Sequence, residues 1–252
     1  MNQITETTFL KGKKHMELIR GKVVTPYKIC LYGQGGVGKS TLASIAENAV
    51  FFDIESGLDQ IDCNRTPLIK TSKELSGYVR ELIQTNQGKT FIFDSCDALE
   101  KIFVDEICKK NKIESLSDLG YGKGYEELNS NWNKFLDMLD WLKGAGKNTI
   151  VIGHEVIKKY ENPMADPYDK ILLKMHQKSA GTLISRMDAV LYMNYEVTVV
   201  KGDNKKGEKT RAFGKGERVL HCCERPAFIA KNRYNMPERI NPQDLFNYLP
   251  KG

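Results

Sequence analysis

The sequence predicts an α/β fold in which helices flank a mainly parallel central sheet, with antiparallel hairpin strands at the C-terminal end. Short apolar runs alternate with amphipathic helical segments through the first 154 residues, which is the pattern of βαβ units in a parallel sheet. After residue 195 the β-rich runs are separated by glycine-rich turns instead of helices. This change favours antiparallel hairpins that extend the sheet.

The individual elements follow from apolar periodicity and from helix-capping residues. The expected strands are residues 28–32, 49–55, 90–95 and 148–154, and the expected helices are residues 40–49, 72–85, 97–111 and 129–146. Ser72 is the expected N-cap of the second helix. A short helix and strand are expected within 182–195, followed by β-rich runs at 196–200 and 218–230. The polar stretches 115–129 and 155–180 are expected to be loops.

Composition limits the class of protein before any motif is considered. The chain has 252 residues, 40% of them hydrophobic and 28% charged, so it can form one substantial domain with its own core. We expect an N-terminal arm at residues 1–22 and a single nucleotide-binding domain at residues 23–252. The sequence contains no apolar run long enough for a membrane span or a secretory signal, so a cytoplasmic protein is expected. The net charge of +6 favours polyanions only modestly.

One motif carries the strongest chemical signal. GQGGVGKS matches the pattern GxxxxGK[ST] and lies between an apolar strand and a helix, which is the context that this phosphate-binding loop, or P-loop, requires. Its backbone N–H groups would surround phosphate oxygens, Lys39 would reach the β- and γ-phosphates, and Ser40 would be a ligand of Mg²⁺. The predicted nucleotide-binding residues are Gly33, Gln34, Gly35, Gly36, Val37, Gly38, Lys39, Ser40 and Thr41. The expected ligands are ATP and Mg²⁺.

Acidic residues at the ends of neighbouring strands complete a site for phosphoryl transfer. Asp94 ends the strand FIFD and is the predicted second Mg²⁺ ligand, although an aspartate there could also cap the next helix, as could Ser95 or Asp97. Asp53 and Glu55 end another strand, and either carboxylate could polarise the attacking water. Glu55 lies nearer the rim where ligands bind to α/β sheets.

His154 ends the strand NTIVIGH and reaches the same rim. It could sense the γ-phosphate and pass that information to the basic segment that follows. A lone histidine is also common as a structural hydrogen-bonding residue, so both interpretations stay open.

The order of these motifs is informative. The P-loop, FFDIESG, FIFDS, VIGH and AKNRYNMPERI follow one another along residues 23–245. This arrangement resembles the RecA-like ATPase core, and most closely the short phage-encoded RecA-like proteins of recombination and single-strand annealing. The resemblance implies that Glu55 activates water, that Asp94 holds Mg²⁺, and that His154 is the sensor that couples the nucleotide to a DNA-binding loop.

The resemblance also implies assembly. Lys231 and Arg233 in the sequence KNR match the basic pair that RecA-like subunits insert into the ATP site of a neighbour. Such cations neutralise transition-state charge in trans. The implied state is a homo-oligomer, a ring or a filament, with ATP sites at subunit interfaces, and the implied activity is ATP hydrolysis that depends on assembly and on DNA.

Two segments match the positions of the DNA loops in that family. Interleaved lysines and tyrosines suit single-stranded DNA, because lysines neutralise phosphates and aromatic rings stack on bases. The candidate residues are Tyr121, Lys123 and Tyr125 in the first segment, and Lys158, Lys159, Lys170, Lys174 and Lys178 in the second.

Two other functions compete with this one. In the first, the chain is a P-loop switch or loader that docks a replication protein, such as a single-strand-binding protein, and does not act on DNA directly. In the second, it is a small-molecule kinase, which usually needs an arginine-rich lid. Residues 155–180 contain no arginine, which argues against the kinase.

Overall fold

A mainly parallel sheet forms the centre of the molecule. The computed structural model describes residues 18, 20–163, 166–196, 198–200, 211–214 and 216–251, without the side chains of 198–200 and 211–213. The strands run in the order β12-β10-β7-β1-β5-β4-β2-β3, and β6 and β11 pair with β5 and β7. From β7 to β3 all pairs are parallel, whereas β10, β11, β12 and β6 pair antiparallel. The predicted fold class is therefore confirmed.

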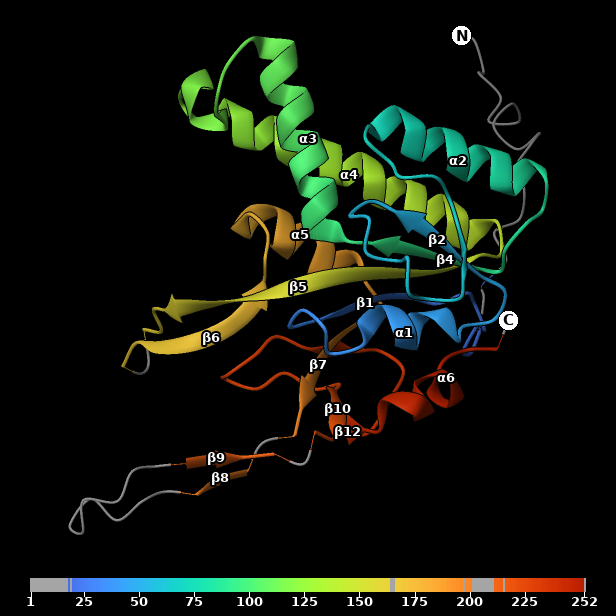
Figure 1. Cartoon of the computed structure of the whole chain (residues 1–252), viewed down its shortest axis with the longest axis vertical. Helices are drawn as coiled ribbons and strands as arrows, with labels where there is room; N and C mark the ends of the chain where they lie inside the picture. The colour runs from blue at the N-terminus through green and yellow to red at the C-terminus, as the bar shows by residue number, and fades with distance from the viewer. Residues whose placement is uncertain are drawn as a thin grey trace, which may run out of the picture.

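The elements follow one another in the alternation that the sequence indicates (Figure 1). The strands are β1 (Lys28–Gly33), β2 (Ala49–Asp53), β3 (Asn64–Arg65), β4 (Thr90–Asp94), β5 (Asn148–Tyr160), β6 (Tyr168–Leu173), β7 (Ala189–Tyr195), β8 (Thr198–Val200), β9 (Arg211–Phe213), β10 (Arg218–His221), β11 (Lys231–Asn232) and β12 (Arg239–Ile240). The helices are α1 (Lys39–Ser44), α2 (Ser72–Gln84), α3 (Cys96–Asn111), α4 (Lys123–Gly144), α5 (Gln177–Arg186) and α6 (Leu245–Tyr248), with short 3-10 turns η2 (Leu116–Leu119) and η4 (Pro242–Asp244).

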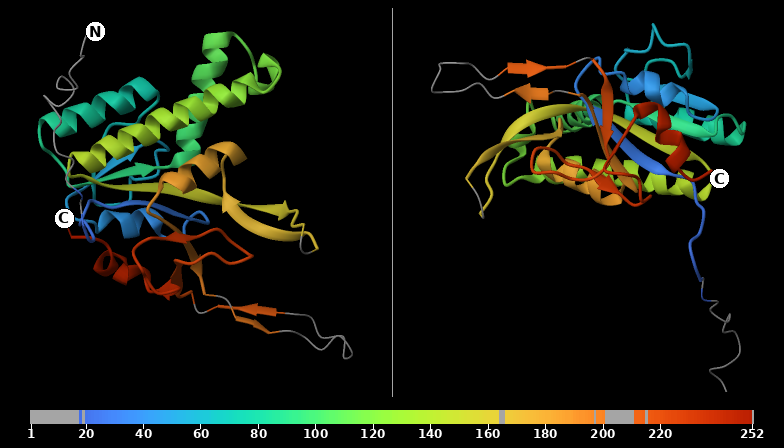
Figure 2. Two further views of the ribbon diagram at one scale, coloured as in Figure 1. Left: turned by 180° about the vertical axis from the view of Figure 1, so that it is seen from behind. Right: turned by 90° about the horizontal axis from the view of Figure 1, so that it is seen from below.

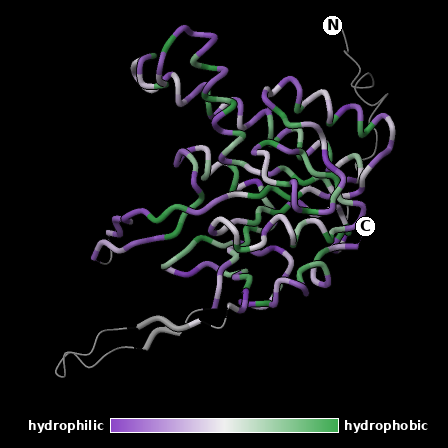
Figure 3. The backbone as a smooth tube through the Cα atoms, in the orientation of Figure 1, coloured by the Kyte–Doolittle hydropathy of each residue, from purple (hydrophilic) through white to green (hydrophobic). Residues whose placement is uncertain are grey.

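The strands alternate side chains between two apolar layers, as a pleated strand must. Cys30 and Tyr32 of β1 join the layer that includes side chains of α2, α3, α4 and α5, whereas Ile29 and Leu31 join the layer that includes Leu42 of α1. The two views in Figure 2 show the four longer helices over one face and α1 and α6 over the other. The most apolar segments accordingly run through the middle of the molecule in Figure 3.

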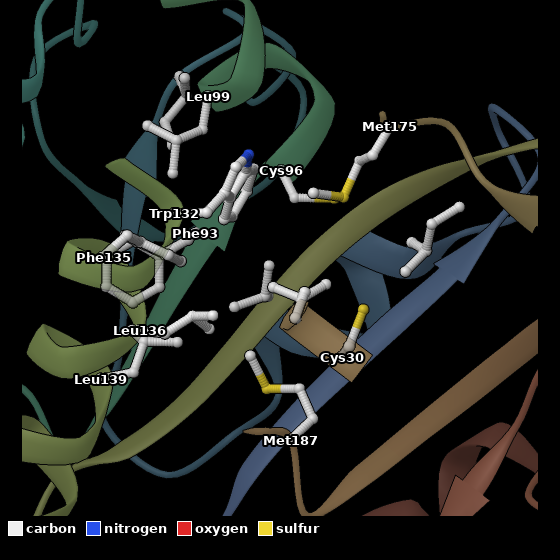
Figure 4. Close-up of a cluster of buried hydrophobic side chains, with 14 of the residues drawn as sticks. Cys30, Phe93, Cys96, Leu99, Trp132, Phe135, Leu136, Leu139, Met175 and Met187 are labelled. Atoms are coloured by element: carbon white, nitrogen blue, oxygen red, sulfur yellow. The ribbon is translucent and has the colours of Figure 1, made fainter. Parts of the chain in front are cut away.

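The larger layer is built on aromatic side chains. Phe93 of β4 meets Phe135 of α4 edge to face at 5.2 Å between ring centroids, and Trp132 is fully buried beside them (Figure 4). Such pairs add about 0.5–1.5 kcal/mol beyond the burial of their apolar area. This packing fixes α3 and α4 against β4 and β5. It thereby fixes Asp94 at the end of β4 and His154 within β5, which continues to Tyr160 instead of ending at His154 as predicted.

Several elements differ from the sequence-based expectation. The first helix ends at Ser44, and the N-cap of α2 is Thr71, which forms a capping box with Glu74, rather than Ser72. The two polar segments expected to be loops are largely regular: α4 begins at Lys123, and residues 155–173 belong mostly to the antiparallel pair β5–β6. Local hydrogen bonds and strand pairing, which polar composition does not reveal, decide these cases.

The C-terminal strands follow the expected hairpin chemistry with a different pairing. β10 joins the main sheet beside β7, whereas β8 pairs with β9 in a separate two-stranded sheet. The predicted arm at residues 1–22 lies mostly outside the described residues. No helix among the residues that the structure describes is long and apolar enough to cross a membrane.

Candidate nucleotide site

The P-loop leaves β1 at the centre of the sheet. A Cβ on Gly33 would stand 2.1 Å from the carbonyl oxygen of Met193, so only glycine allows this approach to β7. Gly36 and Gly38 have φ angles of +76° and +98°, which glycine adopts without strain. The Lys39 ammonium donates hydrogen bonds to the carbonyl oxygens of Gly33 and Gln34 at 3.0 and 2.9 Å. The loop is therefore already curled around the lysine predicted to bind phosphate.

Asp94 lies directly beside the start of α1. The hydroxyl of Ser40 donates a hydrogen bond to Oδ2 of Asp94 at 2.6 Å, so the two predicted Mg²⁺ ligands meet although they are 54 positions apart in the chain. Burial raises the pKa of Asp94 to about 6, although the Ser40 hydrogen bond and the Lys39 charge oppose that rise. These oxygen donors suit Mg²⁺. When bound there, Mg²⁺ would neutralise charge on the phosphates.

The structure distinguishes Asp53 from Glu55. Asp53 is buried, and its carboxylate accepts a hydrogen bond from the Ser56 backbone N–H at 2.8 Å, so it shapes the turn after β2. Glu55 lies beyond the strand, is exposed, and accepts a hydrogen bond from the Ser95 hydroxyl at 2.5 Å. Of the two carboxylates left open by the sequence, Glu55 is the one that faces the rim.

His154 is held by a residue that the sequence offered only as a helix cap. Its Nδ1 lies 3.0 Å from Oδ1 of Asp97 and 3.8 Å from Oε2 of Glu55. The hydrogen bond to Asp97 raises the pKa of His154. Burial favours a higher pKa for Asp97, but hydrogen bonds from His154 and Ser95 outweigh burial and lower the pKa of Asp97. Ser95 and Asp97 thus connect Glu55 to His154, and the Ser-x-Asp spacing after β4 was their only signal.

A sequence model of the family described as "AAA domain" matches residues 25–234. The chain belongs to this family. It is therefore a P-loop ATPase domain of the AAA type, and the family match covers the P-loop together with Glu55, Asp94, His154, Lys231 and Arg233.

A KaiC-like protein of the archaeon Pyrococcus horikoshii superposes with a TM-score of 0.43 at 11% sequence identity, over 87% of this chain and 88% of that one. No curated protein matches the sequence of this AAA domain.

Lys231 and Arg233 lie at the other edge of the sheet of this AAA domain. β11 pairs with the start of β7, at Val190 and Ala189, whereas the P-loop lies beside Met193 at the other end of that strand. The Lys231 ammonium donates to the carbonyl oxygens of Ile184 and Ser185 at 2.9 and 2.8 Å, which caps α5. The Arg233 guanidinium is more exposed and lies 3.4 Å from Asp188. Neither residue is placed to reach the P-loop of its own subunit.

The two predicted DNA segments come together. The ring of Tyr125, in the first turn of α4, stacks on His176 at the end of the second segment, with 4.6 Å between ring centroids. Tyr121 is fully exposed, and Lys123, Lys158, Lys159, Lys174 and Lys178 are exposed as well. Lys170 differs from the prediction that it contacts DNA. It is buried, its ammonium pairs with Glu224 at 2.9 Å, and it lies over the Tyr160 ring. Strand pairing turns its side chain toward the protein, so it is held by the fold rather than presented on the surface.

Proposed function

We propose that this AAA domain is a phage-type RecA-like ATPase that acts on single-stranded DNA in recombination, annealing or replication. One observation carries the proposal: the candidate sensor His154 lies on β5, and β5 is also one of the two strands of the lysine-rich hairpin β5–β6, here called the basic hairpin. β5 passes His154 at the nucleotide rim and continues through Lys158 and Lys159 to its tip. A displacement of His154 would therefore be transmitted along a paired strand to the basic surface.

The base of the hairpin is tied to the same histidine. The backbone N–H of Lys174 donates to the His154 carbonyl oxygen at 2.9 Å, just after β6 ends. Glu100 of α3 accepts hydrogen bonds from the His176 backbone N–H at 2.6 Å and from the Trp132 ring nitrogen at 2.9 Å. α3 begins beside Asp94 and carries Asp97, so one rigid helix contacts both the sensor and the Tyr125–His176 stack.

The residues divide the proposed reaction between them. Glu55 orients and deprotonates the attacking water, while Lys39 and the P-loop backbone neutralise the phosphate oxygens. Ser40 and Asp94 would hold Mg²⁺. Lys231 and Arg233 complete the site only when a second subunit brings them to it, so catalysis requires a homo-oligomer.

ATP turnover measured with and without single-stranded DNA tests this function. We expect DNA to stimulate turnover, and we expect DNA binding to weaken steeply as salt rises, because lysine contacts to phosphates release counterions. A matched titration with double-stranded DNA controls for nonspecific charge. Equal turnover with and without DNA, together with no binding at low salt, would rule the proposal out.

The alternative function is that of a P-loop switch that docks a replication protein. The hairpin offers one observation in its favour, because Ile157 is 62% exposed among the lysines. An apolar side chain at that position suits a protein surface as well as a DNA base. The two functions differ in what ATP promotes: self-assembly on DNA in the first, and a complex with a different protein in the second.

A further inference from the structure

A cavity of about 760 Å³ opens beside the P-loop, and most of the residues that line it have no assigned role so far. Its lining includes Gly38, Thr41 of α1 and the C-cap residue Ile45, and it also includes Arg218 of β10 with Asn241 and Gln243 around η4. The cavity therefore begins where the phosphate-binding loop ends. Its position suits the part of a nucleotide that projects from the loop.

Arg218 comes closest to the loop itself. Its guanidinium carbon and one terminal nitrogen, Nη1, both lie 3.3 Å from the point where a Cβ on Gly38 would stand. A glycine at this position leaves room for the guanidinium against the loop backbone. The loop and Arg218 thus form two sides of one narrow space.

Arg218 shares the cavity with Glu196 and Glu217 but forms an ion pair with neither of them. The side chain is exposed and makes no hydrogen bond or ion pair with any residue that the structure describes. Arg239 lines the same cavity but is paired with Glu196 at 2.5 Å. Of these two arginines, Arg218 is the one whose guanidinium is unpaired beside a loop built for phosphate.

The sheet fixes this placement. Arg218 is opposite Tyr195 in the antiparallel pair β10–β7, and β7 is the strand whose Met193 carbonyl meets Gly33 of the P-loop. The next two residues, Val219 and Leu220, are buried. Arg218 is therefore held at the P-loop edge by backbone pairing and by burial, unlike a side chain on a free loop.

We propose that Arg218 binds the phosphate chain of the nucleotide in its own subunit, with the nucleoside in the adjoining cavity. The inference rests on nucleotide binding at the P-loop, as in the proposed function, and adds a cation that acts in cis. A guanidinium suits this role because its planar fork can donate two hydrogen bonds to phosphate oxygens. Arg218 would thus bind nucleotide before assembly, whereas Arg233 would act only after assembly.

Binding of ADP to the full chain tests the role. We expect Arg218→Ala to weaken ADP binding about tenfold or more, as expected for a lost charge-assisted hydrogen bond to phosphate. The ADP affinity of Arg218→Lys should lie between those of the wild type and Arg218→Ala, because lysine keeps the positive charge but lacks the two-donor guanidinium. Arg80→Ala, on the distant helix α2, is the matched control and should bind like the wild type. Thermal unfolding of each variant shows whether its fold is intact.

The possible results separate the two ideas. If Arg218→Ala binds ADP as tightly as the wild type, the role of Arg218 is wrong although the nucleotide site stands. If the wild type itself binds neither ADP nor ATP, the proposed function fails as well.

Mixed assemblies test whether Arg218 acts on the nucleotide of its own subunit. Arg218→Ala subunits mixed with Lys39→Ala subunits leave every intact P-loop without an Arg218 of its own. We expect turnover to equal the sum of the two separate variants. Recovery of turnover above that sum would mean that a neighbour supplies Arg218, and would overturn the assignment in cis.

Discussion

The two edges of the parallel sheet carry the same kinds of charged residue in different arrangements. At the edge opposite the P-loop, the Asp188 carboxylate lies 2.7 Å from the Lys143 ammonium and accepts a hydrogen bond from the Tyr234 hydroxyl at 3.1 Å. Lys28 pairs with Asp140 on the same edge. At the P-loop edge, Asp94 has a hydroxyl as its hydrogen-bond partner.

The pKa values of the two aspartates show what the difference means. Burial favours a higher pKa at Asp188, but the hydrogen bond from Lys143 outweighs burial, so the pKa of Asp188 is lowered. At Asp94, burial raises the pKa to about 6. Burial likewise lowers the pKa of Lys39. The first edge neutralises its own charges, and the second leaves buried charge incompletely compensated, as ligand-binding sites do. We therefore expect substitutions at the two edges to differ in kind.

Arg233→Ala gives the largest expected effect, because it asks whether the self-neutralised edge also serves a neighbour. We expect ATP turnover by the assembled protein to fall about 10³-fold, the scale of a cation supplied in trans, while nucleotide affinity is unchanged. Equal loss of binding and turnover would contradict the role in trans. Lys231→Met should likewise lower turnover without changing nucleotide affinity. Its thermal unfolding should also be measured, because Lys231 caps α5 as well.

The control for Arg233 is Arg225→Ala, an exposed arginine that pairs with Glu238. It should leave turnover unchanged. Mixing Arg233→Ala with Lys39→Ala subunits should restore part of the activity, in contrast to the mixture that contains Arg218→Ala.

Glu55→Gln tests the P-loop edge next. We expect turnover to fall about 10²-fold, the low end for loss of a general base, with ATP binding retained. The amide oxygen can still accept the hydrogen bond from Ser95, so the loop should keep its shape. Glu81→Gln on α2 is the control with the same chemical change. Full turnover by Glu55→Gln would show that Glu55 is not the general base.

Asp97→Asn sharpens the comparison within the P-loop edge. Because Asp97 holds the His154 ring, its loss should reduce the stimulation of turnover by DNA about tenfold, consistent with loss of one charge-assisted hydrogen bond. Basal turnover should change little. Asp105→Asn, an exposed position on the same helix, serves as control. If basal and stimulated rates fall by the same factor, Asp97 is structural and does not couple the sites.

Asp94→Asn gives the smallest effect, on stability without ligands. The pKa of Asp94 is raised in the folded chain, so its favourable contribution exists at low pH and is lost as pH rises through about 6. Above that pH the free energy of unfolding of Asp94→Asn, which is neutral at this position, should exceed that of the wild type by about 1–3 kcal/mol. Denaturant unfolding at pH 8 and pH 5 checks this, and an equal difference at both values would contradict it.

Regions with strong local signals agreed best with the sequence-based expectation. Apolar runs placed β1, β2 and β4 to within one or two residues and placed the start of β5, and GQGGVGKS placed the P-loop between β1 and α1. Polar segments agreed least. The β5–β6 hairpin and the first turns of α4 depend on backbone pairing and helix propagation, which a count of lysines and tyrosines does not measure.

The sequence by itself determined the fold class, the phosphate loop and a short set of acids at strand ends, because these depend on periodicity and on residue type within a few positions. Only the tertiary structure brought Ser95 and Asp97 between Glu55 and His154, turned Lys170 inward, and set Arg218 against Gly38. Those contacts join residues far apart in the chain. Strand order and packing decide them, and no local pattern carries that information.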